Sequence, residues 1–219
     1  MTEKPYFQDD DVVIYHGDCR DILPTLEPVD LVLTDPPYGI GEAHGKNKSR
    51  GLLAIARDFG SEVWDDEPID AELLALVRSK RETQIIFGGN YYNLPPTSCW
   101  LVWDKENGAT DFADCEMAWT NMKTATRLIH WRWQGMLQGD MKNKDYRWHP
   151  TQKPLAVMHW CITKVPVAQT ILDPFMGSGT TLRAAKDLGR KAVGIEIEER
   201  YCEIAARRMS QSVMALGVH

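Results

Sequence analysis

The C-terminal part of the chain alternates short apolar strands with helices, and this order restricts the fold more than any other feature. A buried strand is predicted over Thr170–Leu172, followed by a helix that ends near Leu188. The next strand is predicted over Lys191–Ile195, and an amphipathic helix over Glu198–Met209 completes the pattern. Strands joined through helices lie parallel in one sheet, with the helices on its faces. We therefore expect an α/β fold with a doubly wound, mostly parallel sheet.

The N-terminal half adds strands and one helix to this sheet. Apolar β-forming runs predict strands over Val12–Tyr15, Val29–Leu33 and Thr83–Phe87, and helical spacing of apolar residues predicts a helix over Asp70–Arg78. A chain of 219 residues is long enough for one domain with a sizeable core. We expect residues 1–219 to form a single domain.

Three alternating segments in the middle of the chain predict an antiparallel portion of the sheet with short connections. They are Cys99–Trp103, Cys115–Thr120 and Arg127–Trp133. The next segment, Gln134–Trp148, contains Gly, Lys and Asn and is predicted to be a flexible basic loop. Five of the eight tryptophans lie in the three segments, and we expect most of them in the core: Trp100, Trp103, Trp119, Trp131 and Trp133.

The predicted strand Val29–Leu33 is followed closely by Asp35, Pro36, Pro37 and Tyr38. Proline has no N–H for a sheet ladder, so the strand stops at the carboxyl edge of the sheet, where ligands bind. An exocyclic amine of a nucleobase is a poor nucleophile, because its lone pair is delocalised into the ring. The Asp35 carboxylate and the Pro36 carbonyl can accept its two N–H groups and free the lone pair to attack an electrophilic methyl group. Tyr38 can stack on the base, a contact worth about 1–3 kcal/mol.

A second ligand-binding pattern follows the strand Thr170–Leu172. Gly177 and Gly179 stand between a strand and a helix, where glycine lets the backbone approach a ligand, and Glu196 lies nineteen residues beyond Gly177. An acidic residue at that distance can bind two ribose hydroxyls. The dinucleotide fingerprint fails because Leu182 stands at its third glycine, and no P-loop sequence occurs. Asp173 would repel a pyrophosphate but attract an ammonium group, so S-adenosylmethionine fits better than NAD or ATP.

The turn Gly17-Asp18-Cys19 follows the first predicted strand and has two interpretations. Asp18 is a good N-cap for a short helix over Arg20–Leu23. At the carboxyl edge of a strand, its carboxylate can also accept a hydrogen bond from an adenine amino group.

The chain carries a net charge of −6, but two segments are basic. Residues 122–153 contain seven Lys or Arg against two Asp, and residues 44–58 contain four against one. These segments can contact phosphates of a nucleic acid, although a solvated charged surface is the alternative. The long polar segment Gly39–Glu67 is predicted to be a basic loop, with a short helix near Leu52–Arg57, that can close over DNA.

The five cysteines are odd in number and form no Cys-x-x-Cys pair. This pattern predicts reduced thiols, with neither a disulfide framework nor a zinc site. The acidic N-terminus has no apolar signal region, and no run of apolar residues reaches membrane-spanning length. We expect a soluble cytoplasmic protein without a bound metal.

Three segments together resemble one family. Asp35–Tyr38, His149–Pro154 and Asp173–Thr181 stand in the order typical of the β group of amino-directed DNA methyltransferases, which methylate adenine N6 or cytosine N4. The resemblance implies a seven-stranded, Rossmann-like methyltransferase sheet and S-adenosylmethionine as cofactor. It also implies double-stranded DNA as partner, with the target base flipped out of the duplex at a cost of a few kcal/mol.

The resemblance also assigns roles to single residues of this chain. The catalytic tetrapeptide corresponds to Asp35, Pro36, Pro37 and Tyr38. The segment Thr151–Lys153 corresponds to the region beside the methionine end of the cofactor, and for Lys153 a surface lysine before a helix is the less favoured alternative. The residues matched to the cofactor site are Asp18, Cys19, Lys153, Asp173, Phe175, Gly177, Ser178, Gly179, Thr180 and Glu196.

Several alternatives stay open at this point. In the family, an aspartate at the first position of the tetrapeptide favours adenine, yet cytosine N4 can use the same two acceptors. A non-catalytic DNA-binding subunit that kept the fold is a further alternative. Cytosine C5 methylation is disfavoured, because it uses a cysteine after proline and no Pro-Cys occurs. The region left for target recognition, residues 106–148, is short, and a second copy of the chain can contribute surface because many relatives dimerise.

Overall fold

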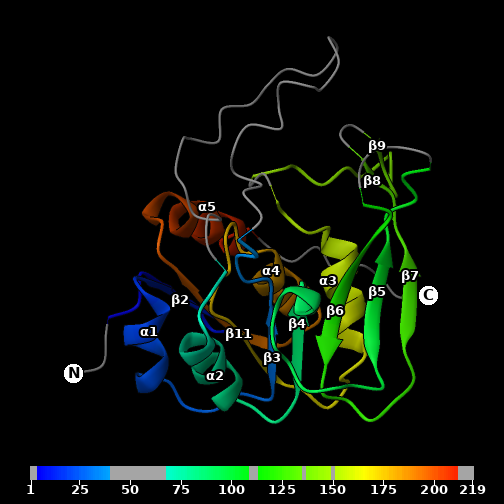
Figure 1. Cartoon of the computed structure of the whole chain (residues 1–219). Coiled ribbons are helices and arrows are strands. Elements are labelled where there is room, and N and C mark those ends of the chain that lie inside the picture. Colours follow the sequence, from blue (N-terminus) through cyan, green and yellow to red (C-terminus); the bar gives the residue numbers. More distant parts are fainter. Residues whose placement is uncertain (1–3, 40–67, 109–112, 135–136, 149–150, 212–219) are drawn as a thin grey trace.

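The computed structural model describes residues 4–39, 68–108, 113–134, 137–148 and 151–211. These residues form a nine-stranded sheet, a separate two-stranded hairpin and five α-helices (Figure 1). The strands of the large sheet are β1 (Phe7–Gln8), β2 (Val12–His16), β3 (Leu31–Thr34), β4 (Gln84–Phe87), β5 (Trp100–Asp104), β6 (Cys115–Thr120), β7 (Arg127–His130), β10 (Thr170–Asp173) and β11 (Lys191–Glu196).

The helices and the hairpin complete the described elements. The hairpin consists of β8 (Trp133–Gln134) and β9 (Leu137–Gln138), and the short 3₁₀ segments are η1 (Leu23–Thr25) and η3 (Gly89–Tyr91). The α-helices are α1 (Cys19–Ile22), α2 (Ala71–Ser79), α3 (Leu155–Thr163), α4 (Thr180–Asp187) and α5 (Glu199–Met209).

The strands lie in the order β1-β2-β11-β10-β3-β4-β6-β5-β7. Every neighbouring pair from β2 to β4 is parallel. Strand β6 runs antiparallel to both β4 and β5, which gives the sheet its antiparallel portion. The predicted α/β fold with a mostly parallel, doubly wound sheet is confirmed.

Two details of the expected sheet are wrong. The sheet has nine strands rather than seven, because β1 and β7 are added at its two edges. The expected strand Arg127–Trp133 ends at His130 and pairs parallel to β5. Both sides of β6 are already occupied by β4 and β5, so the next strand must pair with the far side of β5. A chain that reverses direction after β6 arrives there parallel to β5.

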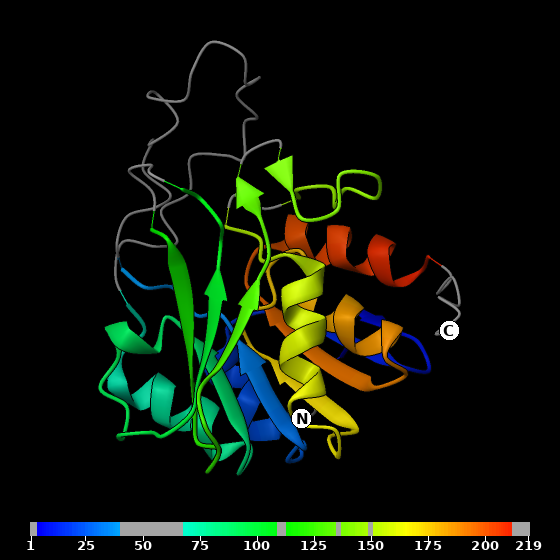
Figure 2. The same cartoon turned by 90° about the vertical axis from the view of Figure 1, so that its right-hand side faces the viewer.

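Helices cover both faces of the sheet (Figure 2). Strand β3 shows how the sequence achieves this, because side chains alternate along a strand. Leu31 and Leu33 belong to the core beneath α3, α4 and α5, whereas Val32 belongs to the core beneath α1 and α2. All three side chains are fully buried, as expected for an inner strand of a parallel sheet.

The tryptophans and cysteines largely follow the expectations. Trp103, Trp119 and Trp133 are buried, and the other two tryptophans of this region, Trp100 and Trp131, pack half-buried against the core. All five cysteines are free thiols, and only Cys115 is exposed.

The loop predictions have mixed outcomes. Residues 134–148 are not one loop, since they contain part of the hairpin β8–β9. The predicted loop Gly39–Glu67 and the short helix Leu52–Arg57 lie outside the described residues, apart from Gly39 itself. No helix within the described ranges is long and apolar enough to cross a membrane.

The packing predicts how two leucines on neighbouring strands differ in their contribution to stability. Leu101 on β5 is 1% exposed, whereas Leu128 on β7 is 51% exposed. We expect Leu101→Ala to lower the free energy of unfolding by about 2–5 kcal/mol, because it removes buried apolar surface and leaves a cavity. Leu128→Ala serves as the matched control and should cost less than about 1 kcal/mol. Urea denaturation of both variants measures the difference, and equal losses would contradict the packing of β5.

Candidate functional site

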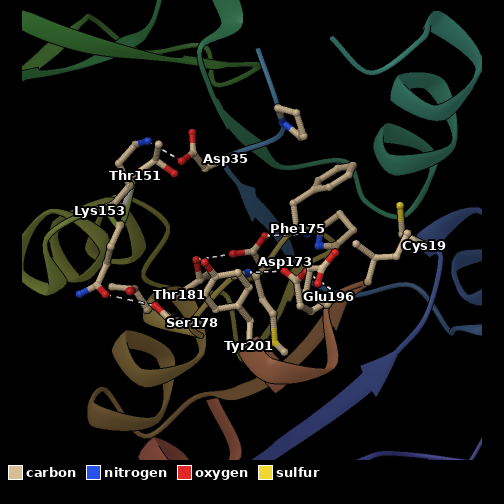
Figure 3. A pocket seen from close by; sticks show the side chains of 18 of the residues that line it. Cys19, Asp35, Thr151, Lys153, Asp173, Phe175, Ser178, Thr181, Glu196 and Tyr201 are labelled. Atoms are coloured by element: carbon tan, nitrogen blue, oxygen red, sulfur yellow. Dashed lines mark hydrogen bonds and ion pairs between the residues drawn. The ribbon is translucent and has the colours of Figure 1, made fainter. Parts of the chain in front are cut away.

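Four acidic side chains lie where four neighbouring parallel strands end. Asp18 follows β2, Glu196 ends β11, Asp173 ends β10 and Asp35 follows β3. These strands are consecutive in the sheet, so their carboxyl ends meet at one edge. All four residues line one cavity of about 470 Å³, and Figure 3 shows Asp35, Asp173 and Glu196 around it.

Most residues that the sequence singled out are brought together at this cavity. Three are not among its lining residues: Pro36, which is buried, Tyr38 and Gly179. Thr151 and Gln152 also line the cavity, whereas His149 and Pro150 of the same motif lie outside the described residues. The lining residues expected from the sequence are Asp18, Cys19, Asp35, Pro37, Lys153, Asp173, Phe175, Gly177, Ser178, Thr180 and Glu196.

Asp173 is buried and held by three donors. The hydroxyl groups of Thr34 and Thr181 donate to its two oxygens at 2.8 and 2.5 Å, and the Phe175 N–H donates at 3.2 Å. Burial raises the pKa of Asp173 to about 6, although these hydrogen bonds oppose the rise. A carboxylate offers about four lone-pair sites, so one acceptor position is left for a ligand.

Glu196 organises the turn that follows β10. Its two oxygens accept the N–H groups of Gly177 and Glu198, each at 2.9 Å. Burial raises the pKa of Glu196 to about 7, against the effect of these two donors. The carboxylate therefore fixes the loop before α4 and faces the cavity at the same time.

Asp18 has the capping role that the sequence allowed, and its contact with an adenine amino group stays a prediction. Its carboxylate accepts the N–H of Arg20 at 2.8 Å and caps α1, and the same residue lines the cavity. Burial raises the pKa of the neighbouring Cys19 thiol to about 12, so this cysteine is protonated at neutral pH.

Gly179 has a structural requirement for glycine in addition to the approach of a ligand that the sequence predicted. Its φ of +78° lies in the left-handed region, and a Cβ atom added there would come within 2.9 Å of the Ala205 Cβ. The left-handed backbone and the close packing of the loop on α5 therefore demand glycine at this position, and the approach of a ligand stays a prediction.

Asp35 is held by its own protein neighbours. The Tyr38 hydroxyl donates to Oδ1, and the Lys153 ammonium donates to Oδ2. Lys153 is not a surface lysine, since only 6% of the residue is exposed. Its Nζ also lies 3.1 Å from Glu116 Oε2, and Glu116 in turn pairs with Lys105 at 2.6 Å.

The aromatic ring of Tyr38 packs against protein rather than standing alone. It stacks on the Tyr91 ring, with centroids 5.0 Å apart and an interplanar angle of 18°. The hydroxyl of the next tyrosine, Tyr92, donates to the Pro37 carbonyl and lies 3.4 Å from the Pro36 carbonyl. Tyr91 and Tyr92 thus support the tetrapeptide from the turn after β4.

A polar cluster of Gln152, Ser178 and Arg208 lies on the side of the cavity opposite Glu196. Ser178 Oγ lies 3.2 Å from the Gln152 Oε1 acceptor, and Arg208 on α5 donates to the Ser178 carbonyl at 2.5 Å. Figure 3 shows Ser178 and Lys153 on the same side, facing Glu196 across the cavity. The segment before α3 and the last helix are therefore joined through Ser178.

Sequence reasoning missed Glu116, Tyr91, Tyr92 and Arg208. Glu116 lies on a strand that reads as alternating apolar and polar, so it gave no local signal. The tyrosines follow Gly88, whose φ of +63° makes the tight turn after β4, and that turn was the one available indication. Arg208 looked like an ordinary charge on an amphipathic helix.

The charges around the cavity restrict its ligand. Among the described lining residues, five are acidic and two are basic. Both basic side chains are already paired, Arg20 with Asp70 at 2.8 Å and Lys153 with Asp35 and Glu116. A phosphate would meet mostly carboxylates, whereas ammonium and hydroxyl groups would find acceptors. The cavity therefore suits a cationic, hydroxyl-bearing ligand without phosphate.

Comparison with known proteins identifies similar chains. A family model described as DNA methylase, N6_N4_Mtase, matches residues 93–207. The Type II methyltransferase M2.LlaDCHI of Lactococcus lactis subsp. cremoris is 25% identical, covering 96% of this chain and 94% of the relative.

Solved structures share the fold. The M1.HpyAVI–SAM complex matches with a TM-score of 0.57 and 22% identity, covering 91% of this chain and 100% of that one. The PvuII DNA methyltransferase, titled cytosine-N4-specific, matches with a TM-score of 0.59 and 15% identity, covering 96% of this chain and 90% of that one. At these identities the two likenesses concern the fold alone.

The raised pKa of Glu196 predicts how stability depends on pH. Its ordinary pKa is 4.5 and its pKa in the folded protein is about 7, so the folded state holds the proton more tightly. The stabilisation that comes from this tighter proton binding by the folded state is fully present below about pH 4.5 and is lost as the pH rises through 7.

We therefore expect Glu196→Gln to gain stability relative to the unchanged protein by about 1–3 kcal/mol between pH 4.5 and pH 8. Urea unfolding over this pH range measures the difference, with Glu82→Gln, an exposed glutamate, as the control. Parallel stability curves for the Glu196 variant and the unchanged protein would contradict the assigned burial.

Proposed function

The chain belongs to the DNA methylase family, and from this premise we propose that it transfers the methyl group of S-adenosylmethionine to the N6 amino group of an adenine in DNA. The observation that carries the proposal is the single cavity shared by Asp35, Asp173 and Glu196. Groups that can hold an amine and groups that can hold a nucleoside thus open onto the same space.

The cofactor fits the charges of the cavity. S-adenosylmethionine has an ammonium, a ribose and a sulfonium but no phosphate, which agrees with the acidic lining and its paired cations. Glu196 would accept the ribose hydroxyls, and Asp18 the adenine amino group. Asp173 has one acceptor position left for the ammonium, beside Ser178 and Thr180. When bound, the cofactor supplies an electrophilic methyl group, whose C–S bond breaks as the amine forms the N–C bond.

The protein's part in the reaction is to hold the amine. Asp35 keeps a partly exposed carboxylate at the cavity and would accept one N–H of the target amine. The Pro36 carbonyl would accept the second N–H, with the Pro-Pro turn steadied by the Tyr92 hydroxyl. After transfer the nitrogen loses one proton, for which Asp35 is the nearest carboxylate in the arrangement that we propose. The catalysis then rests on position and electrostatics.

The base assignment rests on residue 35. An aspartate there favours adenine by resemblance, while cytosine N4 stays the alternative because both amines offer two N–H groups. Tyr38 is held against Tyr91 and would present the aromatic platform for a base that is flipped from the duplex.

DNA contact is proposed for the hairpin region, within the recognition region 106–148 expected from the sequence. Tyr146 is 54% exposed there and packs against Trp148 with ring centroids 4.2 Å apart. Lys142 and Lys144 beside it are exposed cations that can contact phosphates. The contribution of a second copy of the chain stays a prediction.

Removal of the Asp35 carboxylate should separate chemistry from cofactor binding. We expect Asp35→Ala to lower methyl transfer by at least about 1,000-fold, because one of the two acceptors for the amine is lost. Binding of S-adenosylmethionine, measured by isothermal titration calorimetry, should persist. Asp10→Ala, an exposed aspartate at the other end of the sheet, is the control. A near-normal rate for Asp35→Ala would exclude the amine-holding role, and absence of binding heat in the unchanged protein would favour a non-catalytic subunit.

The modified base can be identified directly. We expect N6-methyladenine after incubation of the protein with unmethylated DNA and S-adenosylmethionine, digestion to nucleosides and mass spectrometry. The Asp35→Ala variant is the matched negative control. Detection of N4-methylcytosine alone would overturn the adenine assignment and leave the rest of the proposal in place.

A further inference from the structure

Asp35 stands at the end of a row of alternating charges that no motif in the sequence revealed. The row runs from Asp35 to Lys153, Glu116 and Lys105, and we call it the ion-pair row. Lys153 Nζ contacts Asp35 Oδ2 and lies 3.1 Å from Glu116 Oε2, and Lys105 Nζ lies 2.6 Å from Glu116 Oε1. Its members come from four separate segments: the turn after β3, the segment before α3, strand β6 and the residue after β5.

The ion-pair row is unusually well enclosed for charged groups. The side chain of Lys153 is 7% exposed, and those of Lys105, Asp35 and Glu116 are 19%, 21% and 23% exposed. The rings of Tyr38 and Phe87 lie 5.6 and 5.4 Å from the Lys153 ammonium and enclose it further. Buried ion pairs contribute little net stability, so their presence beside a reactive carboxylate calls for another explanation.

We propose that Lys153 and Glu116 are positioning residues for Asp35, and this inference rests on the proposed function. Lys153 binds one carboxylate oxygen while Tyr38 binds the other, so the plane of the carboxylate is fixed toward the cavity. Glu116 also binds the ammonium and weakens its pull on Asp35, which stays a good acceptor for an amine N–H. This role differs from the cofactor contact that the sequence assigned to Lys153.

The charges around Asp35 determine in which direction each variant should shift its pKa, and this direction can be measured. Burial on its own would lower the pKa of Lys153, but Asp35 and Glu116 outweigh it and raise the pKa above its usual range, so the ammonium is charged. The charged or titratable groups that face Asp35 are Lys153 before α3, Glu116 on β6, Tyr38 after β3 and Asp173 on β10. Burial raises the pKa of Asp35 above its usual range, Lys153 opposes this rise, and Glu116 adds to it.

Two variants should therefore move the pH dependence of methyl transfer in opposite directions. Lys153→Met removes the cation, so the pH below which activity falls should rise by about one unit. Glu116→Gln leaves Lys153 to act on Asp35 alone, so that pH should fall by about half a unit. We also expect Lys153→Met to lower kcat by about 100-fold, because the carboxylate loses its fixed orientation. Lys191→Met is the control and should match the unchanged protein, because Lys191 is exposed and begins β11, at the opposite end of that strand from Glu196.

Isothermal titration with S-adenosylhomocysteine gives a readout that does not depend on turnover. Under the proposal, Lys153→Met and Glu116→Gln bind it within about threefold of the unchanged protein. Binding weakened more than tenfold in Lys153→Met, with an unmoved pH profile in Glu116→Gln, would return Lys153 to the cofactor site and overturn the proposal.

The design separates the two levels of inference. If Lys153→Met does not fold, Glu116→Gln alone decides, since its shift to lower pH requires Lys153 to act on Asp35. Methylation by the unchanged protein without either shift refutes only the positioning role. No methylation by the unchanged protein refutes the proposed function itself.

Discussion

Negative charge gathered at one edge of the sheet is the constraint on which the rest of the structure depends. Four consecutive parallel strands end in or just before a carboxylate, and their order in the sheet brings residues 18, 196, 173 and 35 to one cavity. Carboxylates that share a partly buried space repel each other and lose hydration. The protein compensates with donors that differ in kind among three of them. Threonine hydroxyls hold Asp173, backbone N–H groups hold Glu196, and an ammonium holds Asp35.

These different donors give the carboxylates different properties in one space. Hydroxyl and amide donors only partly offset burial, so Asp173 and Glu196 keep raised pKa values and are suited to neutral or cationic partners. Burial raises the pKa of Asp35 as well, but Asp35 also has a full positive charge beside it, which Glu116 shares. The carboxylates that would hold a cofactor and the carboxylate that would hold an amine thus share one cavity. They differ in the kind of group that donates to them.

Local sequence signals predicted the parts of the site that depend on neighbours along the chain. Strand ends, the Asp-Pro-Pro-Tyr turn and the glycine-containing loop all carry their information within a few residues. The ion-pair row could not be predicted in this way, because Lys153 meets Asp35 across 118 positions and Glu116 lies on another strand. The direction of β7 likewise could not be predicted locally. It depends on β4 and β5 occupying both sides of β6, so that β7 pairs with the far side of β5. Gly179 was recognised as special, but its packing against a helix more than twenty residues later could not be predicted.

Helix α5 contributes to the cavity mainly by packing behind one of its loops. Its Ala205 packs against the position of Gly179, and its Arg208 binds the Ser178 carbonyl, so the helix supports the loop between β10 and α4. Of its residues, only Tyr201 lines the cavity. Shortening the chain from its C-terminus would therefore loosen the loop and lower ligand affinity before any lining residue is deleted, which makes the last helix a remote determinant of binding.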